Sequence, residues 1–223
     1  QLPPVESLRD VRLQTPLRVY SSDGKLIAEF GEKRRNPVRI EQVPPLLKQA
    51  FIASEDDRFY EHPGVDWMAI VRAVVGLVST HEKKQGGSTI TMQVARNFFL
   101  SPEKTYERKL KEVLLACVIE RELSKDEILE LYLNKIFLGH RAYGVGAAAQ
   151  VYYGVTLEKL DLAQMAMIAG LPKAPSRNNP ITDPEAARDR RTYAPGRMLK
   201  LGYIDPTQYA APDDAPLNAQ WHG

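Results

Sequence analysis

The residues best suited to chemistry gather at positions 55–64, where acids, an aromatic ring, a histidine and a glycine follow an apolar segment. Glu55 is the candidate working carboxylate, because general-base chemistry needs a carboxylate that neighbouring groups hold and partly desolvate. Asp56 and His62 could orient that carboxylate, and Phe59 could exclude water from it. A helix end followed by a polar loop would explain the same residues, since such acids mark a functional site only in a fraction of cases.

A second cluster joins Gly86 and Gly87 to Ser88 and Thr89 at the expected start of a helix, which Ser88 could cap. Backbone N–H groups, a hydroxyl and the positive end of the helix would meet there, an arrangement that suits an anion or a phosphate. The cluster is not a P-loop, because no lysine follows the glycines at the required place. A capped helix after a loop is the simpler alternative.

Two further clusters carry charged or polar side chains at helical spacing. Arg108 and Lys109 precede Glu112 by four and three residues, so the three side chains share one helix face. The cations could neutralise a phosphate and the carboxylate could do charge or metal work, although a salt-bridged surface is the simpler explanation of this cluster alone. Glu130 and Asn134 are also four apart, a spacing that more often makes structural hydrogen bonds than catalysis.

Helical periodicity from about residue 43 onward must position these clusters. The sequence predicts a helix from Pro44 or Pro45, a helix capped by Asp66, and a long helix over about 104–123. Its expected apolar stripe consists of Leu110, Val113, Leu114, Cys117 and Val118. Four more helices are predicted. The first begins at the Ser124–Glu127 capping box, the second is short and includes 147–151, the third covers 162–171, and the last runs from 183 toward 202.

Two local features modify this helical pattern. Pro195 and Gly196 should kink or split the last helix, because proline removes a backbone donor. Alternation over 17–30 around a turn at 22–25 predicts a β-hairpin, and residues 38–40 are expected to add a short strand. The predicted fold class is therefore mainly α with a small N-terminal β appendage.

The composition is that of a globular protein of 223 residues, with 43% hydrophobic and 26% charged residues. A net charge of +2 is too small to argue for a nucleic-acid partner, and the four histidines show no zinc-binding spacing. No stretch reaches the roughly 18 apolar residues that a membrane span needs. The sequence is expected to be either a soluble protein or an ectodomain separated from its anchor, and its start without Met favours the second.

Together the clusters resemble the peptidoglycan glycosyltransferase domain of class A penicillin-binding proteins, glycosyltransferase family 51. The resemblance runs from about residue 16 to 210, and residues 141–154 resemble the 1a branch of the family. Five motifs occur in the family's order, at residues 55–64, 86–91, 108–112, 128–134 and 169–175. Any one motif would be weak, whereas the ordered set is specific. Met92 departs from the pattern, because many members have glutamine there.

The resemblance implies a lysozyme-like helical fold with head and jaw lobes. It also implies polymerisation of lipid II into glycan strands, with loss of undecaprenyl diphosphate and inversion at the anomeric carbon. Glu55 would be the general base on the acceptor's 4-hydroxyl, and Glu112 would work near the donor diphosphate, which Arg108 and Lys109 neutralise. The implied substrate-binding positions are Asp56, Phe59, His62, Gly87, Ser88, Thr89, Gln93, Arg96, Lys104, Arg108, Lys109 and Asn134. Asn134 is expected to brace the cleft rather than react.

The resemblance also implies surroundings for the domain. A membrane surface would lie against Phe98, Phe99 and Leu100, at the outer, periplasmic face of the bacterial cytoplasmic membrane, and moenomycin-type inhibitors would bind. Whether a divalent cation, Mg2+ or Mn2+, accompanies the diphosphate near Glu112 stays open. The expected division is a linker and hairpin over 1–42, the glycosyltransferase domain over 43–211 and a tail over 212–223. The anchor helix and a transpeptidase domain are expected outside this sequence.

Two other functions remain open at this point. A lysozyme-like hydrolase or lytic transglycosylase shares the fold class, but the cations beside Glu112 have no use in cleaving a neutral glycan. A catalytically idle module that binds lipid or a protein partner is the second alternative, although every expected catalytic residue type is present. Strand shortening would indicate the hydrolase, and binding without turnover would indicate the idle module.

Overall fold

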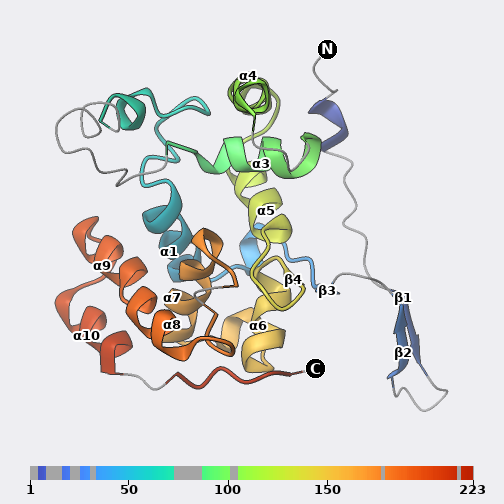
Figure 1. Ribbon diagram of the computed structural model, residues 1–223, viewed down its shortest axis with the longest axis vertical. Coiled ribbons are helices and arrows are strands. Elements are labelled where there is room, and N and C mark those ends of the chain that lie inside the picture. The colour runs from blue at the N-terminus through green and yellow to red at the C-terminus, as the bar shows by residue number, and fades with distance from the viewer. Residues whose placement is uncertain are drawn as a thin grey trace. The chain divides into compact units, whose positions relative to one another are not determined.

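The computed structural model describes residues 5–8, 17–20, 26–30, 34–72, 87–100, 105–176, 179–214 and 217–222. These residues are mainly α-helical, as the periodicity predicted (Figure 1). The chain divides into two compact units: Gln1–Val11 with Glu55–Tyr132, and Arg12–Ser54 with Leu133–Gly223. Each unit is described separately below.

The first unit holds the helices that carry most of the candidate residues. Its elements are the 3-10 helix η1 (Val5–Leu8), a helical stretch over 67–72, and the helices α3 (Ile90–Phe99), α4 (Tyr106–Glu122) and most of α5 (Lys125–Lys135). Helix α3 packs against α4, and η1 also contacts α4. Val65, Met92 and Ala116 form a buried apolar cluster. Val65 lies just before the helical stretch over 67–72, Met92 lies on α3 and Ala116 lies on α4. Met92 is therefore a core residue here, which explains an apolar side chain at this position.

The second unit contains short strands and a group of apolar helices. Strands β1 (Leu17–Tyr20) and β2 (Leu26–Phe30) pair antiparallel, with Leu17 opposite Phe30, and β3 (Arg34–Arg35) pairs parallel with β4 (Ala142–Tyr143). The helical elements are η2 (Ile40–Gln42), α1 (Pro45–Glu55), α6 (Val145–Tyr153), η3 (Leu157–Lys159), α7 (Leu162–Gly170), η4 (Leu171–Lys173), α8 (Pro184–Arg191), α9 (Tyr193–Lys200) and α10 (Pro206–Asp214). Helix α1 belongs to this unit except for its last residue, Glu55.

Helix α7 is the centre of the second unit, because it contacts α6, α8, α9 and α10. Alanines at its contact positions, such as Ala166 and Ala169, are fully buried, as are Ala187 and Ala194 on the helices it touches. Small side chains permit this close approach, and the Asp161–Gln164 capping box fixes where α7 begins.

Several boundary predictions are confirmed. Asp66 Oδ1 accepts a hydrogen bond from Ala69 N at 2.9 Å, and Ser124 and Glu127 form the reciprocal capping box at 2.7 and 3.2 Å. The predicted split near Pro195 is also found, since α8 and α9 are separate helices. Pro195 lies in the first turn of α9, where a missing N–H leaves no helical hydrogen bond unmade.

Other predictions are wrong. Residues 38–40 form no strand: Val38 has no regular secondary structure, Arg39 is the N-cap of η2 and Ile40 begins it. Leu110 and Leu114 of the predicted apolar stripe are 60% and 46% exposed, because α4 instead buries the face with Leu115, Ala116 and Ile119. The cap of α3 is Thr89 rather than Ser88. The predicted turn at 22–25 lies outside the described residues, so the hairpin connection stays a prediction.

None of the helices in the described ranges combines the length and the low charge that crossing a lipid bilayer would require.

Candidate active site

Glu55 is the last residue of α1 and is half-buried. A carboxylate at the C-terminal end of a helix faces the negative end of the macrodipole, so this placement does not stabilise the helix. The chain then turns through residues 56–66, which we call the motif loop. Glu55 directly precedes this loop, and the helical stretch that Asp66 caps directly follows it.

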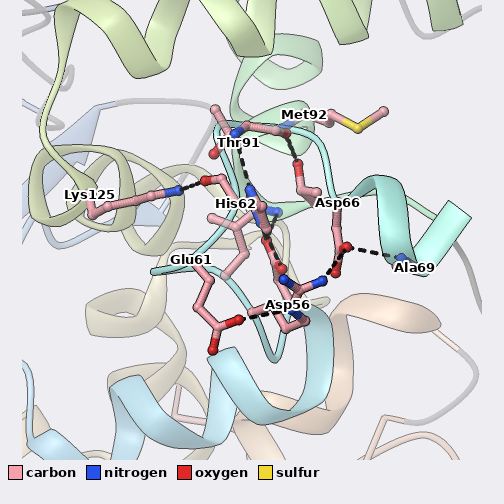
Figure 2. Close-up of polar contacts among 12 residues, drawn as sticks. Asp56, Glu61, His62, Asp66, Ala69, Thr91, Met92 and Lys125 are labelled. Carbon is pink, nitrogen blue, oxygen red and sulfur yellow. Dashed lines mark hydrogen bonds and ion pairs between the residues drawn. The ribbon is translucent and has the colours of Figure 1, made fainter.

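Asp56 and His62 form a buried pair inside the motif loop (Figure 2). His62 Nε2 lies 2.9 and 2.7 Å from the two carboxylate oxygens of Asp56, and Gly64 N donates to His62 Nδ1 at 3.0 Å. Because Nδ1 accepts a hydrogen bond, Nε2 is the ring nitrogen that carries the proton and donates to Asp56. Asp56 Oδ2 also accepts from Ile90 N at 3.0 Å, which ties the loop to the first turn of α3.

Thr89 makes the second link between the motif loop and α3. Its hydroxyl donates to Gly64 O at 2.6 Å and accepts from Met92 N at 3.1 Å, so one side chain caps the helix and holds the loop. Ser88 has a different partner, since its Oγ accepts a hydrogen bond from Lys109 Nζ at 2.6 Å. The second and third sequence clusters therefore meet at Ser88 and Lys109.

Glu112 is a fully buried carboxylate between two cations. Its Oε2 accepts from Lys109 Nζ at 3.1 Å, and its Oε1 lies 3.3 Å from Arg108 Nε. The Arg108 side chain is 14% exposed and that of Lys109 is 45% exposed, so both cations can reach solvent while the acid cannot. The arrangement presents positive charge outward from a fixed buried acid, which suits an anionic ligand.

The buried hydroxyl of Tyr132 on α5 feels the charges of both Glu55 and Arg96. Burial raises the pKa of the Tyr132 hydroxyl well above its usual value; the nearby carboxylates of Glu55 and Asp56 raise it further, and Arg96 lowers it. The raised pKa keeps this hydroxyl neutral at physiological pH. Tyr132 was not among the predicted site residues, although it lies within the motif at 128–134.

The remaining predicted residues are placed as follows. Phe59 is fully buried and Gln93 is buried on α3, whereas Gly87 and Arg96 are half-exposed. Phe98, Phe99 and Leu100 are also half-exposed; the strongly exposed apolar side chains of this unit include Trp67, Met68 and Val71. Lys104 and Gly86 lie outside the described residues.

Asn134 belongs to the second unit and clamps the main chain at Val38. Its Nδ2 donates to Val38 O and its Oδ1 accepts from Val38 N, both at 2.8 Å. The Asn134 residue is buried, with 5% of its surface exposed. Both the bracing of the cleft and a contact of Asn134 with substrate stay predictions.

The donor set near Glu112 does not suit a divalent cation. Within the described ranges, no three His, Cys, Asp or Glu side chains gather closely enough to hold a metal ion. The charged groups next to Glu112 are two cations, which would repel a metal. No step proposed below passes through a metal.

Two residues that the sequence analysis missed complete the surroundings of the motif loop. Lys125 Nζ donates to His62 O and to Glu120 Oε1, both at 2.7 Å. The sequence signals for this pair are weak, because Glu120 and Lys125 look like ordinary surface charges at the junction of two helices.

A family model described as Transglycosylase matches residues 23–199. The chain therefore belongs to the transglycosylase family, and its assignment to glycosyltransferase family 51 is confirmed. It is similar to penicillin-binding protein 1A of Escherichia coli (59% identity over 223 residues) and of Pseudomonas aeruginosa (56% over 221 residues). These alignments cover 100% and 99% of this chain but 26% and 27% of the two relatives, so the chain spans about a quarter of their length.

The 2.6 Å crystal structure of penicillin-binding protein 1A from Haemophilus influenzae is also similar to this chain. The two share 35% identity with a TM-score of 0.55, over 95% of this chain and 22% of the other. The mainly helical fold predicted from the sequence is thus the fold of this family.

Proposed function

We propose that the chain polymerises lipid II into glycan strands and releases undecaprenyl diphosphate. The observation that carries this proposal is the buried Glu112 flanked by Arg108 and Lys109, in the same unit as a half-buried Glu55. A diphosphate leaving group needs positive charge rather than a protonated acid, and a hydroxyl nucleophile needs a base. The two clusters supply one of each.

In the proposed reaction, Glu55 takes the proton from the 4-hydroxyl of the acceptor sugar. The hydroxyl oxygen forms the new glycosidic bond at the anomeric carbon of the donor as the bond to the diphosphate breaks, which inverts the configuration. The proton stays on Glu55, and the electron pair of the broken bond leaves with the diphosphate. Asp56 and His62 act indirectly, because their polar atoms already bond within the motif loop.

The cations around Glu112 would bind the leaving group. Arg108, Lys109 and Arg96 neutralise the diphosphate, and Glu112 holds the first two cations in place before substrate arrives. Ser88 contributes as well, because its contact with Lys109 fixes the ammonium near the start of α3. Gly87, Thr89, Gln93 and Lys104 complete the proposed binding positions.

The proposal includes a membrane-bound substrate and therefore a membrane surface. Exposed Trp67, Met68 and Val71, together with half-exposed Phe98 and Phe99, support an apolar landing surface for a polyprenyl chain. The reaction would take place at the periplasmic face of the cytoplasmic membrane, in a lysozyme-like domain with head and jaw lobes over about residues 43–211. Moenomycin-type inhibitors should compete with lipid II.

The test is polymerisation of fluorescent lipid II in detergent by the parent chain and by Glu55→Gln. Loss of a general base should lower the rate about 10²- to 10⁴-fold, while the conserved shape keeps the melting temperature unchanged. Glu61→Gln is the matched control, because Glu61 is an exposed acid of the same loop whose partner is Arg58. Glu55→Gln activity within a few-fold of the parent would refute the base assignment.

The same assay separates the alternatives by product size. Polymer that muramidase digests, formed only by the parent, supports the transferase. Shortening of preformed glycan strands would support the hydrolase, and lipid II binding without any product would support the idle module.

A further inference from the structure

The motif loop is held from α5 as well as from α3, through a lysine that no step above uses. Lys125 directs its ammonium group toward three acceptors: His62 O at 2.7 Å, Glu120 Oε1 at 2.7 Å, and the face of the Phe59 ring, whose centroid is 4.6 Å away. An ammonium group has three N–H donors, so a carbonyl, a carboxylate and an aromatic face can be served together. In Figure 2, Lys125 reaches His62 from the side opposite Asp66.

Glu120 fixes this lysine and connects it to α3. The Glu120 side chain on α4 is only 9% exposed, and its Oε1 accepts a second hydrogen bond from Thr91 Oγ1 at 2.7 Å. Lys125 is 21% exposed at its side chain, so water screens this ion pair less than it does a surface pair. Tyr60 OH donates to Asp126 Oδ1 at 3.2 Å, which gives α5 a second contact with the same loop.

The contact at His62 reaches Glu55 in two steps. His62 is gripped at its carbonyl by Lys125 and at its ring by Asp56, and Asp56 is the residue next to Glu55. Gly64, two residues after His62, lies very close to α4. A Cβ at this position would be 2.8 Å from Ala116 O and 2.9 Å from Glu120 Cγ. The loop therefore cannot shift toward α4, and Lys125 opposes a shift away from α5.

We infer that Lys125, held by Glu120, is a positioning residue for Glu55: it fixes the motif loop so that the carboxylate meets the acceptor hydroxyl. The inference rests on the proposed role of Glu55. A base displaced by about 1 Å can lose roughly 10²-fold in rate, whereas Arg108 and Lys109 contact Glu112 and Ser88, none of which belongs to the loop. Lys125 thus acts on the transfer step and not on substrate affinity.

The test uses Lys125→Met, which keeps the aliphatic stem and removes the charge and the three donors. We expect kcat for lipid II polymerisation to fall roughly 10- to 100-fold while KM stays within about two-fold. Lys111→Met is the matched control, because Lys111 forms an equally short 2.6 Å ion pair with Glu107 but on the exposed side of α4. It should retain parental kcat and KM.

A second variant and a second measurement cover the case in which Lys125→Met folds poorly. Glu120→Gln keeps an acceptor for Thr91 and removes the partner charge, so it should lower kcat in the same direction with KM unchanged. Amide hydrogen exchange should rise at residues 61–64 in both variants and stay parental along α4.

Three results would overturn the inference: parental kcat in both variants, a raised KM at parental kcat, or a loss of kcat no larger than the loss of folded protein. Glu55→Gln run in parallel separates this from failure of the proposed function. An active Glu55→Gln removes the base assignment itself, whereas an inactive Glu55→Gln beside a fully active Lys125→Met removes only the role of Lys125.

Discussion

At the scale of single residues, the two proposed catalytic acids are held in different ways. Glu112 is fully buried and lies within salt-bridge distance of two cations, whereas Glu55 is half-buried at a helix end, beside the motif loop. The difference suits their proposed tasks. A group that organises fixed cations needs no contact with solvent, but a base must be reached by a hydroxyl.

Arg108→Ala should weaken use of the lipid-linked donor. Losing one charged hydrogen-bond donor to a phosphate should lower kcat/KM roughly 10- to 100-fold, mainly through KM for lipid II. Arg121→Ala is the control, because Arg121 is an exposed arginine in the last turn of the same helix. Steady-state kinetics on lipid II would measure both, and equal losses would mean that the leaving group binds elsewhere.

At the scale of elements, the motif loop depends on its close approach to α4. Gly64 has φ of +100°, and a Cβ at this position would lie 2.8 Å from the main-chain oxygen of Ala116. The approach is possible because the residue has no side chain, and it places Gly64 O within reach of the Thr89 hydroxyl.

Gly64→Ala should therefore destabilise the fold more than Gly202→Ala does. Both glycines have positive φ, a conformation that costs about 1–3 kcal/mol with a side chain, but nothing lies within 4 Å of a Cβ at Gly202. The clash at Gly64 should add at least about 1 kcal/mol. Urea unfolding of the two variants gives the difference, and equal free energies of unfolding would show that the loop can move off α4.

The sequence predicts where elements begin better than which way they face. The caps at Asp66 and Ser124 are local contacts between residues three apart, and both predictions are confirmed. The buried face of α4 depends instead on its neighbours: Ala116 packs on Val65 and Met92, while Leu110 and Leu114 stay exposed. The predicted cap of α3 was wrong by one residue for a related reason. Ser88 and Thr89 both carry hydroxyls, but Thr89 caps α3 while Ser88 accepts a hydrogen bond from Lys109.

The candidate site shows the same limit. Five motifs pointed to the residues around Glu55 and Glu112, because their types and spacing are visible along the chain. Lys125 and Tyr132 were missed as site residues, since their relation to Glu55 depends on packing between α5 and the motif loop.

In the fold, helix α10 was also missed, because part of it was predicted to be a tail.

At the scale of the whole molecule, the two compact units differ in where their buried polar contacts lie. Both units have apolar cores, but the first also has charged and polar contacts around the motif loop, while the second has α7 packed against four helices and a buried tyrosine hydroxyl. Tyr152 is the best example, because its hydroxyl donates to Leu138 O and accepts from Asn179 Nδ2, both at 2.6 Å.

Tyr152 should make the stability of the protein depend on alkaline pH. Burial raises the pKa of Tyr152 to about 12, and the hydrogen bond from Asn179 lowers it slightly. In the unfolded chain a tyrosine titrates near pH 10, so this contribution is fully present below about pH 10 and is lost as the pH rises through 12. Urea unfolding at a series of pH values measures the slope.

Tyr152→Phe should reduce that alkaline slope. At neutral pH the same substitution should lower the free energy of unfolding by about 1–3 kcal/mol, because Leu138 O and Asn179 lose a partner. Tyr106→Phe serves as the control, since Tyr106 is 98% exposed and should leave both quantities unchanged. An unaltered alkaline slope in Tyr152→Phe would contradict the prediction.

The clamp between Asn134 and Val38 has a consequence for how the sequence can drift. At position 38 the amide of Asn134 bonds the main-chain N–H and carbonyl, groups that nearly every amino acid offers. Substitution at position 38 therefore leaves the clamp intact except for proline, which has no N–H, whereas position 134 needs an amide of this length. Mutational tolerance at these two touching positions is unequal, and covariation between them would carry little signal of their contact.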